Sequence, residues 1–206
     1  MQVRCIALAT ALLVVGLLQS TASRAGAYED GDSAFRGKNY EAALKHWHPI
    51  AVAGDARAQL GVATLYYGGY GVAIDYGLAR GWCEKAAEQG EPQAIYLLGA
   101  MYRDGKGVTA DRDKAVVHFR NAAEQNVQGA QYSLGLMYFL GEGISVDYGE
   151  AYYWLSLASD EIGTETAQLR MVARHVRDEA KAKLTSELLA ELNDRIATKR
   201  SAAASR

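Results

Sequence analysis

A repeat of 36 residues constrains the fold of this 206-residue chain more than any other feature of its sequence. The stretch GYGVAIDYGLA begins at Gly69, and related stretches begin 36 residues later at Gly105 (GKGVTADRDKA) and after another 36 residues at Gly141 (GEGISVDYGEA). A catalytic loop normally occurs once in a chain. A residue pattern that recurs three times at constant spacing indicates a structural repeat instead. Repeats of 20 to 50 residues expose an apolar face that only the next unit can cover, so the copies are predicted to stack.

Nine positions of the repeat hold the same or a similar residue in all three copies. They are Ala58, Ala94 and Ala130; Val62, Leu98 and Leu134; Tyr66, Tyr102 and Tyr138; Gly69, Gly105 and Gly141; Gly71, Gly107 and Gly143; Val72, Val108 and Ile144; Asp75, Asp111 and Asp147; Ala79, Ala115 and Ala151; and Ala86, Ala122 and Ala158. A partial copy precedes them, with Asn39 in the aspartate column and Ala43 in an alanine column. A first repeat that departs from its neighbours is typical of an end cap.

Each copy of the repeat predicts two helices joined by a turn. In the second copy, an apolar stripe at helical spacing runs from Ala94 to Tyr102. The paired glycines end this helix, because its C-terminal turn needs a positive φ that glycine adopts without cost. The aspartate that follows, Asp111 in this copy, is placed to cap the next helix. The alanine columns are small because two helices must approach closely there.

This pattern resembles the Sel-like repeat family, which is related to the tetratricopeptide repeats. The resemblance rests on A-x-x-x-L-G-x-x-Y-x-x-G-x-G-V-x-x-D-x-x-x-A, read from Ala94 to Ala115, and covers residues 39 to about 160. It implies an all-α, right-handed solenoid of stacked helix-turn-helix repeats that acts as a protein-interaction scaffold, often bacterial, and it implies no particular reaction. Two departures are local: Ala63 replaces the glycine of the other copies, and Asn126 stands in the column of Gly90.

The repeat and its flanks divide the chain into four parts. Residues 1–27 are expected to be a secretory signal peptide, and 28–160 the solenoid. Within the solenoid we expect a partial repeat over 28–54 and full repeats over about 55–90, 91–126 and 127–160. Residues 161–198 are predicted to form a helical C-terminal cap, with Thr185 capping its last helix, and residues 199–206 to fray.

The amino terminus has the three parts of an export signal. A short basic segment precedes 14 uncharged residues from Cys5 to Leu18, and Ala25-Gly26-Ala27 supplies an A-x-A cleavage pattern. The apolar run is shorter than the ~20 residues of a membrane span, so the expectation is a periplasmic or secreted protein with no membrane anchor after cleavage. A buried N-terminal helix is the alternative.

The charge of the mature chain limits the classes of partner that it can bind, and its cysteine content limits its disulfides. Cleavage after Ala27 removes Arg4 and Arg24 and no acidic residue, which leaves 20 basic and 24 acidic residues and a net charge of −4. This balance argues against nucleic-acid binding, which needs a basic surface. Only Cys83 remains, so no internal disulfide is expected.

Residues that could carry chemistry have simpler structural explanations. His46, Trp82, His118 and Trp154 share one repeat column, which favours a packing position for flat rings over a metal site. Cys83 shares its column with Phe119 and Leu155 and is interpreted as a small core residue rather than a nucleophile. His48 and His175 belong to no ligand pattern, and the glycines at 68–71 lack the context of a phosphate loop. The sequence therefore indicates no catalytic, cofactor or metal site.

One face of the first helix of each repeat is a candidate binding surface. In the first full copy this face consists of positions 60 and 67, which are seven residues apart, and position 64 between them. Most of the equivalent residues in the three copies are aromatic, aliphatic or arginine. They are Leu60, Thr64 and Tyr67; Tyr96 and Arg103; and Tyr132, Leu136 and Phe139. Aromatic residues and arginine dominate interface hot spots, and first helices of such repeats line the concave side. Packing on neighbouring repeats is the alternative role.

The resulting hypothesis is an exported, non-catalytic adaptor that binds a partner protein through the concave face of the solenoid. Two other classes stay open. The chain could act enzymatically on a cell-wall component, or it could bind a glycan or another small ligand.

The first prediction concerns processing. The exported protein should begin at Tyr28, because Ala27 closes the one well-placed A-x-A site. Intact-mass measurement on the exported protein checks this, and a dominant species that still contains Cys5 would contradict it.

Overall fold

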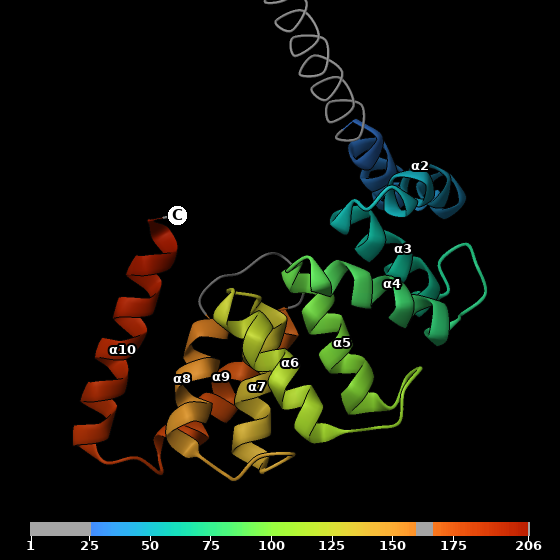
Figure 1. Ribbon diagram of the computed structural model, residues 1–206. Helices are drawn as coiled ribbons and strands as arrows, with labels where there is room; N and C mark the ends of the chain where they lie inside the picture. The colour runs from blue at the N-terminus through green and yellow to red at the C-terminus, as the bar shows by residue number, and fades with distance from the viewer. Residues whose placement is uncertain (1–25, 160–166, 206) are drawn as a thin grey trace, which may run out of the picture. The chain divides into compact units, whose positions relative to one another are not determined.

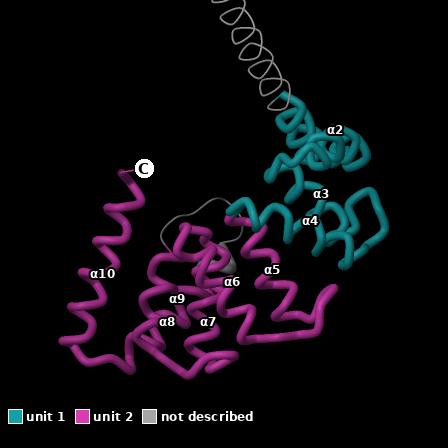
Figure 2. The backbone as a smooth tube through the Cα atoms, in the orientation of Figure 1, with its two compact units in different colours: residues 1–91 teal, residues 92–206 magenta. Residues whose placement is uncertain are grey.

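The computed structural model describes residues 26–159 and 167–205, which fall into two compact units (Figure 2). Unit 1 ends at Glu91 and unit 2 begins at Pro92, so the division coincides with a boundary between two copies of the repeat. Most of the expected signal peptide lies outside the described residues. Residues 26 and 27, its last two, belong to a helical segment over 26–36.

Every regular element in these two ranges is a helix (Figure 1), which confirms the predicted all-α fold. Unit 1 contains the 26–36 segment and then α2 (Tyr40–Val52), α3 (Ala56–Gly68) and α4 (Tyr76–Glu88). Unit 2 contains α5 (Pro92–Asp104), α6 (Arg112–Glu124), α7 (Gln128–Leu140), α8 (Tyr148–Ala158), α9 (Ala167–Lys181) and α10 (Ser186–Ala204). The three full copies of the repeat are the hairpins α3–α4, α5–α6 and α7–α8.

The aspartate column caps the second helix of each hairpin. The carboxylates of Asp75, Asp111 and Asp147 accept hydrogen bonds from the backbone N–H three residues later, at 2.9, 3.0 and 2.9 Å. Asn39 does the same for α2 at 3.2 Å, so the partial first copy keeps this feature of the repeat. These bonds satisfy backbone donors that the first turn of a helix leaves free. Thr185 caps α10 in the same way, as the sequence predicts.

The two loop glycines of each hairpin are held in the left-handed region, with φ between 67° and 72°. The second glycine is also in close contact with another hairpin. A β-carbon on Gly143 would lie 2.6 Å from the backbone carbonyl group of Arg112, the first residue of α6, and one on Gly71 would lie 2.8 Å from Tyr40, the first residue of α2. Glycine is therefore required here by backbone conformation and by space.

The second helix of one hairpin packs against the first helix of the next, α2 on α3 in unit 1 and α6 on α7 in unit 2. The alanine columns lie at these contacts and at those inside each hairpin, and eight of their nine members in the full copies are fully buried. A buried glutamine adds a polar link that the sequence analysis missed. Gln59 and Gln131 donate to the carbonyl oxygens of Ala51 and Ala123, near the C-terminal ends of α2 and α6. Each of these carbonyl oxygens also accepts a backbone hydrogen bond, from Gly54 and Asn126 respectively, so the glutamine adds a second bond that links neighbouring helices.

Large and small side chains alternate at one contact inside each hairpin. A β-carbon on Gly99 would lie 2.7 Å from the ring of Phe119, and one on Gly135 would lie 2.7 Å from Leu155. At the equivalent positions of the first full copy stand Ala63 and Cys83, both fully buried. Ala63, which is larger than the glycines at 99 and 135, faces Cys83, which is smaller than Phe119 and Leu155. The combined side-chain volume at this contact is therefore similar in the three repeats.

Trp47 organises the core at the N-terminal side of unit 1. Its indole ring lies against Gly31 and Gly61, where added β-carbons would come within 2.4 and 2.6 Å of it. The indole N–H donates to the carbonyl oxygen of Tyr28 at 3.2 Å, and the Tyr28 ring stacks on it at a centroid distance of 6.1 Å. The first helical segment is thereby joined to the first copy of the repeat.

In unit 2, α9 packs on α7 and α8, and α10 packs on α8. Polar contacts hold α10 in place: Arg195 pairs with Glu150, Tyr152 donates to Asn193 at 2.9 Å, and Lys199 pairs with Glu124 at 3.2 Å. Residues 199–206 are predicted from the sequence to fray, whereas in the structure α10 continues to Ala204. Lys199 pairs with Glu124 in this stretch, beyond Ile196, the last buried apolar residue of the helix.

A comparison of three glycine substitutions tests the loop contact. Gly143→Ala should lower the free energy of unfolding by about 2–4 kcal/mol, because it combines an unfavourable φ with a backbone clash. Gly54→Ala has a φ of 97° but no atom within 4 Å of the added β-carbon, so it should show the conformational cost alone. Gly81→Ala in α4 has no clash and should be neutral or stabilising, since alanine favours helix. Chemical denaturation measures all three, and equal losses for Gly143→Ala and Gly54→Ala would contradict the contact.

A double-mutant cycle tests the volume balance inside a hairpin. Gly99→Ala in the wild-type chain should destabilise by about 1–3 kcal/mol, because the new methyl group overlaps the Phe119 ring. The same substitution in a Phe119→Cys background should cost nothing or stabilise, since that pair reproduces Ala63 and Cys83. Additive losses from denaturation midpoints would show that the two columns are independent.

Candidate functional site

In unit 1, the candidate binding face consists of Leu60, Thr64 and Tyr67 on α3. All three are half-buried, while the opposite side of the helix, including Ala58, Val62 and Leu65, is fully buried. The Thr64 hydroxyl donates to the carbonyl oxygen of Leu60 at 2.9 Å. The ring of Tyr67 meets Tyr76 edge to face at a centroid distance of 5.5 Å. The face is thus a partly exposed surface whose side chains are held by their own hairpin.

In unit 2, the predicted residues lie on α5 and α7, and each packs while leaving part of its surface open. Tyr96 lies between the Phe119 ring, at 5.7 Å, and Gly129 at the start of α7. Phe139 meets Tyr148 at 5.7 Å. Burial raises the pKa of Tyr132, and Leu136 is half-buried. Because the structure places the two sets of residues in separate units, each set is a surface of its own unit.

Arg103 is the most exposed member of the predicted set, with 39% of its side chain accessible. Its guanidinium group donates to both carboxylate oxygens of Asp104, at 2.7 and 3.2 Å. This bond is the main reason that the pKa of Asp104 is lowered, and the nearby charges of Arg103 and Lys106 add to it. The pairing fixes the position of a guanidinium group whose stem remains accessible.

The column that supports this face is not among the residues predicted from the sequence. Tyr67 pairs with Tyr76, and Phe139 pairs with Tyr148, at equivalent positions of two copies. In the middle copy both columns hold arginine, Arg103 and Arg112. Arg112 pairs with Glu142 of the next loop at 3.7 Å. The sequence did contain a signal for this pair of columns, because both change from an aromatic residue to arginine in the same copy.

The histidine and tryptophan column is a packing position for rings in three of its four copies. His118 stacks on Tyr102 at 5.3 Å with an interplanar angle of 9°, and burial lowers its pKa. Trp154 is buried, and its N–H donates to Glu150 at 2.9 Å. Trp82 meets His48 edge to face at 5.9 Å. His46 is half-buried. No group of three or more His, Cys, Asp or Glu residues is placed to hold a metal ion in the described ranges.

Cys83 is a core residue, as the repeat column predicts. It is fully buried, and desolvation raises the pKa of its thiol to about 12, with Glu84 adding a smaller effect. A thiol with such a pKa carries almost no thiolate at neutral pH, and the thiolate is the nucleophile. His175, the remaining histidine, lies on the surface of α9 and pairs with Glu179 at 2.8 Å.

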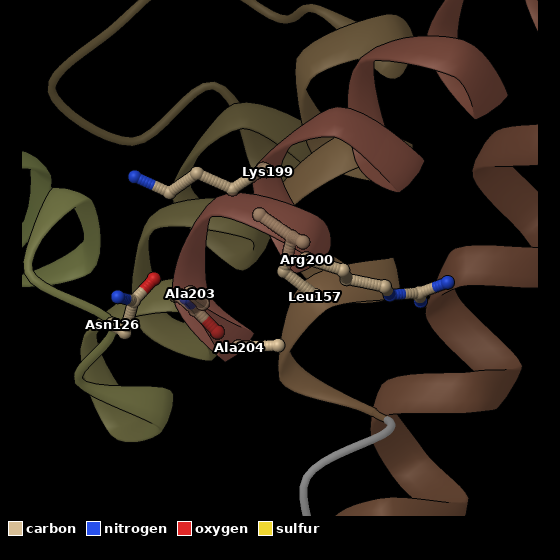
Figure 3. Close-up of a pocket in the computed structure, with 7 residues that line it drawn as sticks. Asn126, Leu157, Lys199, Arg200, Ala203 and Ala204 are labelled. Atoms are coloured by element: carbon tan, nitrogen blue, oxygen red, sulfur yellow. The ribbon is translucent and has the colours of Figure 1, made fainter. Parts of the chain in front are cut away.

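A cavity of about 310 Å³ in unit 2 lies among the α6–α7 loop, α7, α8 and α10 (Figure 3). Its lining consists of Asn126, Gln131, Leu157, Lys199, Arg200, Ala203 and Ala204. The ammonium group of Lys199 donates to the carbonyl oxygen of Glu124 at 2.8 Å and pairs with the Glu124 carboxylate. Gln131 donates to Ala123. These polar groups are engaged with the protein itself, so the cavity offers little to a polar ligand.

The fold defines the class of protein as an α-helical repeat protein, in which helix-turn-helix units stack through small residues. The chain belongs to the Sel1 repeat family: the family's Sel1 repeat profile matches residues 22–55, 54–91, 92–127 and 129–161. This confirms the resemblance and the predicted solenoid class. It also assigns a repeat to the N-terminal segment that the sequence analysis treats as a partial copy. Proteins of this family are typically protein-interaction scaffolds.

Two solved structures are similar to this chain. A Sel1 repeat protein from Oxalobacter formigenes is 33% identical, with a TM-score of 0.60, over 65% of this chain and 55% of that one. The protein c5321, a protective antigen of uropathogenic Escherichia coli strains with an SLR fold, is 29% identical, with a TM-score of 0.74, over 88% of this chain and 38% of its own. The present chain therefore spans only about half or less of these two chains. A comparison with curated protein sequences finds no match.

Proposed function

We propose that the chain is an exported, non-catalytic adaptor that binds a partner protein through the exposed faces of the first helices of its repeats. The observation that carries this proposal is that partly accessible aromatic, aliphatic and arginine residues recur at equivalent positions of the first helices, on α3 in unit 1 and on α5 and α7 in unit 2. Members of the family are typically interaction scaffolds. Within this chain, these positions change in chemistry from copy to copy while the alanine columns stay constant.

The physical state of these side chains suits binding. Tyr67 and Phe139 are oriented by ring contacts, and Arg103 by its carboxylate partner. A partner that covers them loses little side-chain entropy, because their conformations are already restricted. Their large apolar area and the guanidinium group are the chemistry found at interface hot spots.

Export is the second part of the proposal, and it rests on the N-terminal sequence. The contacts of Tyr28 are compatible with it. If processing follows Ala27, Tyr28 becomes the first residue and still provides both its ring and its carbonyl oxygen to Trp47. No helix within the described residues is long and apolar enough to cross a membrane.

Site-specific photo-crosslinking tests the binding face. A benzophenone amino acid at position 139 replaces one aromatic ring with another and should crosslink a partner in cells, which mass spectrometry then identifies. The same amino acid at position 117 is the matched control, because Val117 is 62% exposed but lies on a second helix, α6. The proposal expects a partner crosslinked from position 139 and not from 117.

A loss-of-function variant completes this test with the identified partner. Replacing Tyr67, Arg103 and Phe139 with alanine should weaken binding by tenfold or more while the helical content stays unchanged, as expected for hot spots on a preformed surface. Val117→Ala should have no effect. A triple variant that unfolds assigns these side chains to the core, and a folded variant that binds normally moves the interface elsewhere.

A further inference from the structure

Helix α9 follows the last repeat in the position of a further first helix, but it is packed on one side only. It lies against α8, as α7 lies against α6 and α3 against α2. In α7 seven residues are buried, because α8 covers another side of that helix. Between positions 171 and 181 of α9, the buried residues are Ala173 and Ala180. The reason is that α10 has its main contacts with α8 rather than with α9.

The open side of α9 carries two large apolar residues. Met171 is 70% exposed and Val172 is 46% exposed. His175 and Glu179 lie on the same open side and pair with each other at 2.8 Å. At ~100° per residue, the exposed positions from 171 to 181 cover about half of the circumference of the helix. Two apolar side chains alone do not define a partner, so the charges beside them decide what fits this surface.

Two cations beside these apolar residues have no partner of their own. Arg174 and Lys181 are both exposed, and their separation of seven residues places them on the same side of the helix. Within the described ranges neither makes a hydrogen bond or an ion pair. The carboxylate between them, Asp178, is already paired with Arg177 at 2.8 Å. The open side is therefore cationic, although the chain expected after cleavage carries a net charge of −4.

The repeat itself shows which kind of partner such a surface accommodates. In each full repeat a second helix packs along the first helix, and α9 has no second helix packed along it in this way within the described residues. We propose that α9 binds an amphipathic helix of a partner protein, whose acidic residues face Arg174 and Lys181 and whose apolar residues cover Met171 and Val172. This surface is separate from the first-helix faces of α3, α5 and α7, so it does not depend on the proposed adaptor function.

A lipid surface suits this side of α9 less well than a helix does. A helix that lies in a membrane interface needs a broad apolar side, and the large apolar residues exposed on α9 are Met171 and Val172. Asp178 and Glu179 lie on the same open side, where the negative charge of anionic lipids would repel them. The occupant is therefore a protein segment, and lipid vesicles serve as a control in the test.

Synthetic peptides test the charge and the helical pattern separately. The probe is a fluorescein-labelled peptide of ~20 residues, long enough to form an isolated helix, with leucines on one side and glutamates seven residues apart beside them. A second peptide has lysine in place of each glutamate. A third has the composition of the first with its leucines distributed around the helix. Fluorescence anisotropy with the full chain should show salt-sensitive binding of the first peptide and roughly tenfold weaker binding of the other two.

A charge exchange assigns the binding to α9. Arg174→Glu and Lys181→Glu together should weaken binding of the glutamate peptide by roughly tenfold or more and should create binding of the lysine peptide. Met171→Glu should also weaken binding of the glutamate peptide. Lys45→Glu and Val117→Glu are the matched controls, because these residues are exposed on α2 and α6, and both variants should bind as the wild type does. Circular dichroism checks that each variant keeps its helical content.

Five outcomes overturn the proposal. They are no binding of the glutamate peptide at submillimolar concentrations, equal affinity for the glutamate and lysine peptides, equal affinity for the third peptide, unchanged affinity in the double variant, and binding of phosphatidylglycerol vesicles that the double variant loses. The last outcome would assign this side of α9 to a lipid surface. If the double variant fails to fold, the comparison of the three peptides on the wild-type chain and Met171→Glu decide the result.

Discussion

The close contact between a loop glycine and the start of a neighbouring hairpin's second helix is the constraint on which the repeat depends. Gly143 lies against Arg112 and Gly71 against Tyr40, at distances that leave no room for a β-carbon. The helix start that each glycine covers is the one capped by the aspartate column, through Asp111 and Asn39. One loop therefore ends its own first helix and also fixes the spacing to the preceding hairpin. A side chain at this glycine would separate the hairpins at their loop end and open the alanine contacts between them.

This arrangement explains which positions are free to vary. Where helices touch closely, the residues are alanine or glycine, and a change on one side is matched on the other, as Ala63 with Cys83 and Gly99 with Phe119 show. The exposed face of the first helices carries no such restriction. Its column holds Tyr67, Arg103 and Phe139 in successive copies, and the neighbouring column changes with it from tyrosine to Arg112 and back. A change of charge at matched positions alters the chemistry of the face, while the alanine columns of the same copies stay unchanged.

The sequence predicts the repeated part of the fold almost completely and its ends only in part. A period of 36 residues specifies helices, caps and loop conformations, because each is a local consequence of a residue type: aspartate for the cap, glycine for positive φ, alanine for close contact. The contacts of Gln59 and Gln131 could not be predicted from the repeat, because the middle copy has Ile95 at the equivalent position. The extent of α10 could not be predicted either. Its last turns lie beyond Ile196, the last buried apolar residue, and Lys199 in this stretch contacts Glu124, which lies 75 residues earlier in the chain.

The end of the repeat is also where this structure departs most from simple stacking. Nearly every residue of α8 is buried, because α7 covers one side of it while α9 and α10 cover others. These two helices carry no repeat pattern, so no set of alanine and glycine columns matches them to α8. The contacts of α10 are therefore mostly polar, through Arg195, Asn193 and Lys199, and its buried apolar residues are Leu192 and Ile196. Helices joined by long polar side chains pack less tightly than helices in contact through alanine. Two cavities beside Arg200, and a buried Ser156 hydroxyl that has no hydrogen-bond partner in the described residues, are what this looser packing leaves.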